Sequence, residues 1–248
     1  MLASMEWGSG GRTALLLHGI SSNKEGWWRV GPAIAELGYR VIALDLRGHG
    51  ANDHPESLTL NEYAEDIFDS VSSADLLLGH SLGGAISITM LQLRPDFCDK
   101  LILEDPALML NNSPTTLSWL TAEFDHAGPI TKESVWENAP TWHPTDAGHK
   151  ADALNQSGRE AVVRTLESNP NINLIAELVA IAQPTLLLGA DPALVSLAPP
   201  ALGEGIVALN ENVAFHTIPG SSHSIHRDEC DAMLKLIGKW LERDGADL

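Results

Sequence analysis

The stretch that decides the fold reads Ala74-Asp75-Leu76-Leu77-Leu78-Gly79-His80-Ser81-Leu82-Gly83-Gly84. An apolar run ends at Gly79, and a stretch with helical character follows from residue 82 to residue 93. The segment from Gly79 to Gly83 fits the pattern Gly-x-Ser-x-Gly, in which a serine occupies a sharp turn between a strand and a helix. The glycines are needed because a larger side chain would clash with the strand or the helix. We therefore predict Ser81 as a nucleophile.

Similar apolar runs recur along the chain and alternate with helical patterns. Strands are predicted at residues 13–17, 39–44, 74–78, 100–103, 184–188 and 213–218. Helices are predicted at residues 30–37, 59–71, 82–93 and 231–241. This alternation indicates an α/β fold, with a mostly parallel sheet and helices on both faces. Ligands of such sheets bind beyond the carboxyl ends of the strands, where the candidate site residues fall.

One segment interrupts the alternation. From residue 107 to residue 183 the chain carries helical patterns, four prolines between Pro114 and Pro144, and no convincing strand. We expect residues 107–183 to form a helical cap or lid inserted into a core domain of residues 1–106 and 184–248.

A serine hydroxyl needs a base to take its proton, and imidazole suits that task near neutral pH. Of the ten histidines, His223 follows the last predicted strand in Gly220-Ser221-Ser222-His223 and is the predicted base. His226 is interpreted as a loop histidine that braces its neighbour. A metal site built from His223, His226 and Asp228 is not expected, because no second cluster with ligand spacing supports it.

Four motifs in this chain order resemble those of the α/β-hydrolase superfamily, in its serine esterase and lactonase-like branch. They are Leu17-His18-Gly19-Ile20, Asp45-Leu46-Arg47-Gly48-His49-Gly50, Gly79-His80-Ser81-Leu82-Gly83 and Gly220-Ser221-Ser222-His223. The resemblance implies an α/β-hydrolase fold and a Ser-His-Asp triad that needs no cofactor. It also implies an oxyanion hole made by the backbone N–H groups of Leu82, which follows the nucleophile, and Ile20.

Two carboxylates compete for the role of triad acid. Asp191 follows the strand after the cap, which is the commonest family position, although one residue rather than two separates it from Gly189. Asp105 follows the strand at 100–103, where some branches of the family place their acid. Asp191 is the preferred candidate and Asp105 the alternative, while Glu104 is expected to point to the opposite face.

The resemblance implies hydrolysis of a carboxylic ester or lactone of a small to medium apolar substrate through an acyl-enzyme intermediate. Four tryptophans are candidates for the substrate pocket: Trp27, Trp28, Trp119 and Trp142. We expect one of the adjacent pair Trp27 and Trp28 to pack in the core. The alternatives are hydrolysis of a carbon–carbon bond or a thioester on the same triad, and a ligand-binding or receptor protein that keeps the fold.

Composition narrows the partners and the compartment. The chain is 44% hydrophobic and 19% charged, with a formal net charge of −18. Such a charge disfavours binding to nucleic acid or anionic membranes. No apolar run reaches the roughly 18 residues of a membrane span. With no visible secretory signal and with Cys98 and Cys230 expected to be reduced thiols, we predict a cytoplasmic monomer or homodimer that acts on a small molecule.

Overall fold

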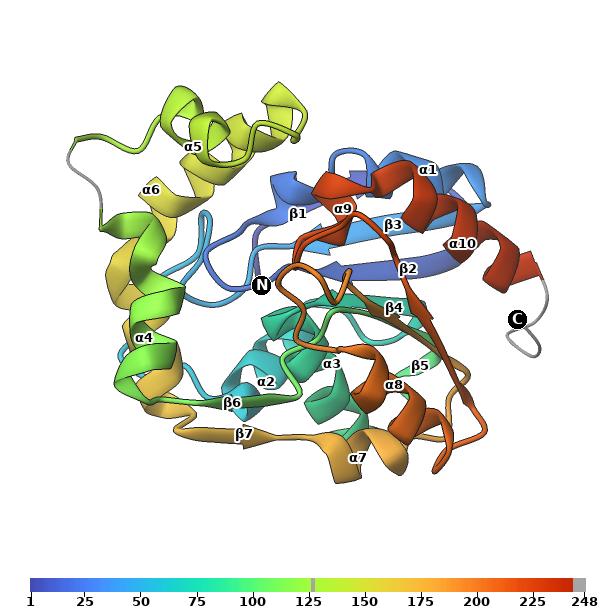
Figure 1. The fold of residues 1–248 in the computed structure, drawn as a ribbon. Helices are drawn as coiled ribbons and strands as arrows, with labels where there is room; N and C mark the ends of the chain where they lie inside the picture. Colours follow the sequence, from blue (N-terminus) through green and yellow to red (C-terminus); the bar gives the residue numbers. More distant parts are fainter. Residues whose placement is uncertain (126–127, 243–248) are drawn as a thin grey trace.

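The computed structural model describes residues 1–125 and 128–242 of the chain. Its main feature is a seven-stranded sheet with the order β1-β3-β2-β4-β5-β8-β9 (Figure 1). The strands are β1 (Ser4–Trp7), β2 (Arg12–Leu17), β3 (Tyr39–Leu44), β4 (Ala74–His80), β5 (Cys98–Glu104), β8 (Thr185–Gly189) and β9 (Val213–Thr217). All neighbours are parallel except β1, which pairs antiparallel with β3. The predicted parallel sheet is confirmed.

Helices cover both faces of this sheet. Helices α1 (Val30–Glu36) and α10 (Cys230–Glu242) lie on one face, and α2 (Leu60–Ser70), α3 (Leu82–Leu93) and α8 (Pro200–Val207) lie on the other (Figure 1). Successive side chains of a strand point to opposite faces. Accordingly Leu15 and Leu17 join the buried cluster under α2 and α3, whereas Ala14 and Leu16 join the one under α1 and α10. These two clusters are the core that holds the strand ends in place.

The first strand was not predicted. β1 has the sequence Ser-Met-Glu-Trp, and its residues alternate between exposed and half-buried positions at the edge of the sheet. Such a short edge strand carries no continuous apolar run, so its pairing with β3 decides its conformation. Glu6 of β1 forms a bidentate pair with Arg40 of β3, at 2.8 and 2.9 Å.

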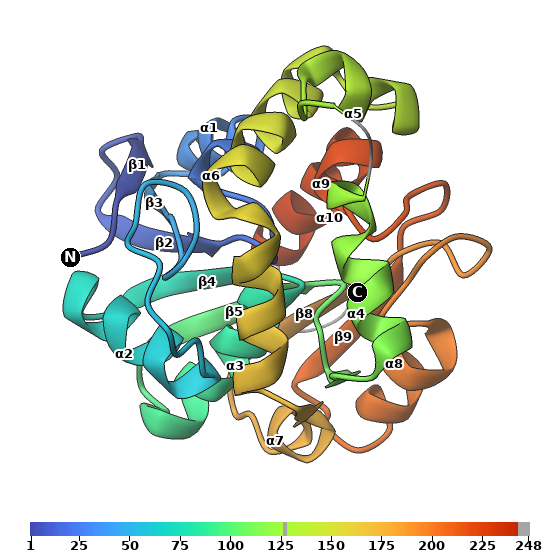
Figure 2. The same ribbon diagram turned by 90° about the vertical axis from the view of Figure 1, so that its left-hand side faces the viewer.

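The helices between residues 114 and 168 of the segment predicted as a helical cap lie beyond the carboxyl ends of the parallel strands, whereas its last helix packs beside α3 and α8 (Figures 1 and 2). It contains α4 (Pro114–Thr121), a 3-10 turn η2 (Ala122–Phe124), α5 (Lys132–Asn138), α6 (Pro144–Ser168) and α7 (Ile175–Val179). Helix α6 is interrupted at Gly158, where φ is +68°. The division into a core and a cap domain stays a prediction.

The expectation of no strand in this segment was wrong. β6 (Met109–Asn111) and β7 (Asn171–Asn173) pair antiparallel and form a small second sheet. Each strand has three residues, and its partner lies about sixty positions away in the chain. No local sequence pattern therefore predicts the pairing. The two strands hold the two ends of the segment together.

Among the described residues, no helix combines the length and the apolar character needed to cross a membrane.

Candidate active site

Ser81 sits at the turn between β4 and α3 with φ +52° and ψ −113°, in the left-handed half of backbone space that side chains rarely adopt. Close packing enforces the turn. A Cβ atom on Gly79 would lie 2.4 Å from the carbonyl oxygen of Gly83, and one on Gly83 would lie 2.2 Å from that of Leu17. Both positions therefore require glycine, which is the physical basis of the Gly-x-Ser-x-Gly spacing here.

His223 lies against Ser81. It follows β9 and precedes the single turn α9 (Ile225–Asp228). Its Nε2 atom is 2.9 Å from Ser81 Oγ, and its Nδ1 atom is 2.7 Å from Asp105 Oδ2. An ionised Asp105 accepts a hydrogen bond from the N–H at Nδ1. Nε2 then carries no proton and is free to take the proton of Ser81. The three side chains thus form one hydrogen-bonded series, in the order that a nucleophile, its base and an orienting acid would have.

Asp105 is fully buried at the end of β5, with φ +38°. Its Oδ1 atom accepts hydrogen bonds from Ser196 Oγ at 2.8 Å and from the N–H of Ala198 at 2.9 Å, and Oδ2 accepts from the N–H of Leu197 at 2.9 Å. Burial alone would raise the pKa of Asp105, but the bond from His223 and these backbone donors lower it. The carboxylate therefore stays charged and fixes the orientation of the imidazole.

Asp191, the preferred acid of the sequence interpretation, does not contact His223. Its carboxylate accepts from the N–H of Ala193 at 2.9 Å and from the N–H of Gly220 at 2.8 Å. The first of these bonds is an Asx turn, and the second ties the β8 loop to the segment that precedes His223. These two backbone donors lower the pKa of Asp191. The geometry thus corrects the preferred assignment and places the alternative, Asp105, in the series.

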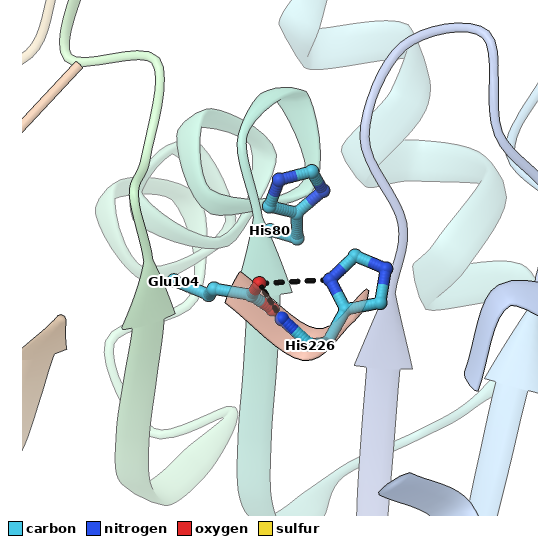
Figure 3. Close-up of side chains that lie close together, drawn as sticks. All are labelled: His80, Glu104 and His226. Atoms are coloured by element: carbon cyan, nitrogen blue, oxygen red, sulfur yellow. Dashed lines mark hydrogen bonds and ion pairs between the residues drawn. The ribbon is translucent and has the colours of Figure 1, made fainter. Parts of the chain in front are cut away.

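A second buried cluster, formed by His80, Glu104 and His226, lies next to His223 (Figure 3). Glu104 points away from Asp105, as expected, and its Oε1 atom lies 2.8 Å from both the backbone nitrogen and Nδ1 of His226. The ring of His80 packs 4.8 Å from that of His223, and its Nε2 donates to the carbonyl oxygen of His223 at 2.9 Å. His226 and His80 therefore hold the loop that carries the predicted base, in agreement with the bracing role expected for His226.

These three residues are also the described ones with the spacing of metal ligands. His80, Glu104 and His226 each offer one ligand atom, and those atoms lie within 4.8 Å of one another. Glu104 Oε2 is buried and has no hydrogen-bond partner. Burial raises the pKa of Glu104, and it lowers the pKa of both histidines well below the usual value. The hydrogen bonds within the cluster account for its compactness, because the backbone N–H and the Nδ1 atom of His226 both donate to Glu104 Oε1.

The loop after β2 carries the predicted oxyanion residue Ile20. Ile20 and Leu82 both line a small apolar recess at Ser81. The preceding His18 has a fixed tautomer: Nδ1 donates to the carbonyl oxygen of Gly19 at 2.8 Å, and Nε2 accepts from the N–H of Leu46 at 3.0 Å. His18 therefore links the loop to the segment that follows β3.

Ser21, the next residue, adopts φ +53° without being a glycine. Lys150 of α6 holds it there, because its Nζ donates to the carbonyl oxygen of Ser21 at 3.1 Å and to its Oγ at 2.9 Å. Glu123 of η2 pairs with Lys150 at 2.7 Å and accepts from Ser21 Oγ at 3.1 Å. Burial lowers the pKa of Lys150 and Glu123 partly restores it. The sequence does not predict these contacts, because Ser21, Glu123 and Lys150 lie far apart in the chain.

The burial of two histidines predicts that the free energy of unfolding depends on pH. Burial lowers the pKa of His18 to about 3 and that of His49 to about 4, from an ordinary value of 6.5. Below pH 6.5 the unfolded chain binds protons that the folded chain does not, so the free energy of unfolding decreases as the pH falls from 6.5 toward 4. The slope is about 1.4 kcal/mol per pH unit for each such histidine.

We expect the thermal midpoint to drop markedly between pH 7 and pH 5, as followed by circular dichroism. His49→Gln should flatten this dependence, while His54→Gln, at an exposed position, should leave it unchanged. Equal slopes for the wild type and His49→Gln would contradict the assignment.

A cavity of about 360 Å³ opens beside Ser81 and His223. Two of the four predicted pocket tryptophans, Trp119 and Trp142, line it, and the ring of Trp119 lies 6.3 Å from that of His223. The charged side chains of Glu123, Lys150 and Arg227 complete its walls. The cavity thus has both apolar and charged walls, whereas the sequence predicted an apolar pocket.

The other two tryptophans do not line this cavity. Trp27 is 1% exposed and packs in the core, with its ring 4.9 Å from that of His226. Trp28 donates from Nε1 to Asp146 Oδ1 at 2.9 Å and so joins the core to helix α6. The expectation that one of the pair is a core residue is confirmed, but neither forms the wall beside Ser81.

The comparisons with known proteins agree with this architecture. A family model described as the alpha/beta hydrolase fold matches residues 14–229. A putative esterase/lipase of Haemophilus influenzae is 23% identical over 246 residues, which cover 93% of this chain and 83% of the relative. The 2-succinyl-6-hydroxy-2,4-cyclohexadiene-1-carboxylate synthase of an Enterobacter species is 26% identical and covers 92% of this chain and 90% of the relative. Three uncharacterized mycobacterial proteins, 37% identical, match over only 28% of their length.

Solved structures share the fold over nearly the whole chain. The E-2-(acetamidomethylene)succinate hydrolase has a TM-score of 0.77 and 22% identity, and covers 97% of this chain and 95% of that chain. A thioesterase domain from the curacin biosynthetic pathway has a TM-score of 0.74 and 24% identity, with 95% and 94% coverage. At these identities the likeness establishes the fold and nothing beyond it.

Proposed function

Because the chain belongs to the alpha/beta-hydrolase family, we propose that this hydrolase cleaves a carboxylic ester or lactone through an acyl-enzyme on Ser81. The observation that carries the proposal is the hydrogen-bonded series at the strand ends. Ser81 Oγ lies 2.9 Å from His223 Nε2, and His223 Nδ1 lies 2.7 Å from Asp105 Oδ2. This order supports general-base activation of the serine, because Asp105 holds the imidazole in the tautomer that can accept a proton.

In the proposed reaction Ser81 Oγ attacks the carbonyl carbon while His223 Nε2 takes the hydroxyl proton. The tetrahedral intermediate places its oxyanion at the backbone N–H groups of Ile20 and Leu82, which supply the stabilisation that develops only in the transition state. His223 then passes the proton to the leaving alcohol, and the acyl group stays on Ser81. Water, deprotonated by His223, attacks the ester carbonyl, and the acid leaves as the serine regains its proton.

The surroundings of Ser81 support a substrate of small to medium size. The apolar recess formed by Ile20, Leu82 and Leu110 suits a short acyl or alkyl group, and the cavity of about 360 Å³ suits the rest of the molecule. Hydrolysis of a thioester or carbon–carbon bond on the same triad, and ligand binding without turnover, are the outcomes that the following experiment separates from ester hydrolysis.

We expect a fluorophosphonate probe to modify one residue, Ser81, as located by peptide mass spectrometry. A panel of p-nitrophenyl esters of increasing chain length should show turnover that the same probe abolishes in proportion to labelling. Turnover of acyl thioesters but not of oxygen esters would favour a thioesterase. If the protein neither turns over any ester nor reacts with the probe, the proposed function is wrong.

A further inference from the structure

Arg227 is a buried cation on the wall of the candidate active-site cavity. It belongs to α9, four residues after His223, and is 4% exposed. Its Nη2 atom donates to Ser22 Oγ at 3.1 Å, and its guanidinium carbon lies 4.8 Å from the centre of the Trp142 ring. Arg227 therefore shares one cavity with the predicted nucleophile and base, although the proposed mechanism leaves it without a role.

Within residues 1–125 and 128–242, no carboxylate oxygen lies at ion-pair distance from Arg227. Buried charges are normally paired, because transfer of a charge out of water is costly. Four carboxylates act on it through space. Each has an oxygen that accepts from another donor, while Glu104 Oε2 and Asp146 Oδ2 have no hydrogen-bond partner. Glu123 pairs with Lys150, Asp146 accepts from Trp28, Glu104 from His226, and Asp228 from Trp142 and Ser222.

The guanidinium group has unused donors. Its Nε atom is buried and has no hydrogen-bond partner. Its Nη1 atom makes no hydrogen bond with the described residues and is not among the fully enclosed atoms, so it is the nitrogen left for the cavity. The other cation of the wall, Lys150, already has Ser21 and Glu123 as acceptors. An anion entering the cavity thus meets its free donors at Arg227.

We propose that Arg227 is an anion subsite and that the substrate carries a carboxylate a few bonds from the scissile carbonyl. This inference rests on the proposed function of Ser81. A carboxylate suits the subsite because an ionised oxygen accepts a charge-assisted hydrogen bond from Nη1, and such a bond is stronger than one between neutral groups. The substrate class is then a monoester or lactone of a short dicarboxylic acid, with its carboxylate at Arg227 and its scissile carbonyl at Ser81.

The overall negative charge of the chain works against the binding of an anionic substrate. A formal net charge of −18 repels anionic substrates at long range. A preference for an anionic ester must therefore arise inside the cavity. Charge-assisted hydrogen bonds contribute about 1.5–3 kcal/mol, which corresponds to a preference of roughly tenfold to a hundredfold in kcat/KM.

The test compares the p-nitrophenyl monoester of glutaric acid with its methyl-capped diester and with p-nitrophenyl pentanoate, all at the same ionic strength. We expect the monoester to be preferred by about tenfold or more. Free glutarate should inhibit competitively and glutaramide should not. A phosphate-terminated ester of the same length distinguishes a general anion site from a carboxylate site, and its preference over the monoester would overturn the carboxylate assignment.

Arg227→Gln should bring the monoester-to-pentanoate ratio of kcat/KM close to one, and Arg227→Lys should retain part of it. Arg40→Gln removes an exposed arginine outside the cavity and should keep the wild-type ratio. Wild-type measurements remain decisive if Arg227→Gln does not fold. Equal rates on all three esters, with Ser81 still labelled by the fluorophosphonate, would overturn the subsite and leave the hydrolase intact. An unchanged ratio in folded Arg227→Gln would also overturn it.

Discussion

Asp105→Asn is expected to lower kcat on the best ester by about 10⁴-fold. In the wild type the carboxylate accepts a hydrogen bond from Nδ1 of His223, with 2.7 Å between Nδ1 and Oδ2. An asparagine that turns its amide nitrogen toward His223 donates to Nδ1, so the ring proton moves to Nε2 and can no longer be replaced by that of Ser81. Either orientation sets the amide nitrogen against a backbone N–H, that of Leu197 at the Oδ2 position or that of Ala198 at the Oδ1 position, and neither keeps the negative charge that stabilises the imidazolium. Steady-state kinetics with a circular dichroism spectrum would measure the loss in a folded protein.

Asp191→Asn is the matched control, since it makes the same chemical change at the other candidate position. Its carboxylate meets only the N–H groups of Ala193 and Gly220, so we expect activity within a few-fold of the wild type. The assignment of Asp105 would fail if Asp191→Asn lost activity by orders of magnitude while Asp105→Asn kept it.

The ambiguity between these two aspartates shows what a sequence can and cannot specify. β5 and β8 are neighbours in the sheet, so the residues that follow them emerge side by side at the same edge. Both positions are therefore compatible with the topology. The choice depends on the turn itself: Asp105 takes φ +38° and points inward, while Asp191 folds back on its own loop. No local pattern encodes that difference.

Features with a local cause were predicted well. The helix predicted at residues 59–71 is α2, and it begins with a capping box in which Thr59 and Glu62 satisfy each other's backbone donors. The turn at Ser81 follows from glycines that the packing requires. By contrast, Lys150 and Arg227 reach the cavity through tertiary contacts. The one available signal for Arg227 was its position four residues after His223, the spacing of a helical turn.

Lys150→Met is expected to lower kcat by up to about 10²- to 10³-fold, the effect of losing one oxyanion donor, with a much smaller change in KM. A non-glycine residue at positive φ carries about 1–3 kcal/mol of strain, and the two bonds from Lys150 hold Ser21 in that state. Without them Ser21 can relax and carry the adjacent N–H of Ile20 away from the oxyanion. A residue that only stabilises the fold would change the thermal midpoint but not kcat at a temperature where the variant is folded.

Two further variants make this prediction specific to the loop. Lys150→Arg keeps a donor within reach of Ser21 and should recover part of kcat, while Lys235→Met removes an exposed lysine on α10 and should have no effect. The rate of fluorophosphonate labelling should fall together with kcat, because phosphonylation of Ser81 also develops charge on an oxygen at the oxyanion hole. Normal labelling and normal kcat in folded Lys150→Met would show that the oxyanion loop keeps its conformation without the two bonds from Lys150, and that this side chain acts on the site only by lining the cavity.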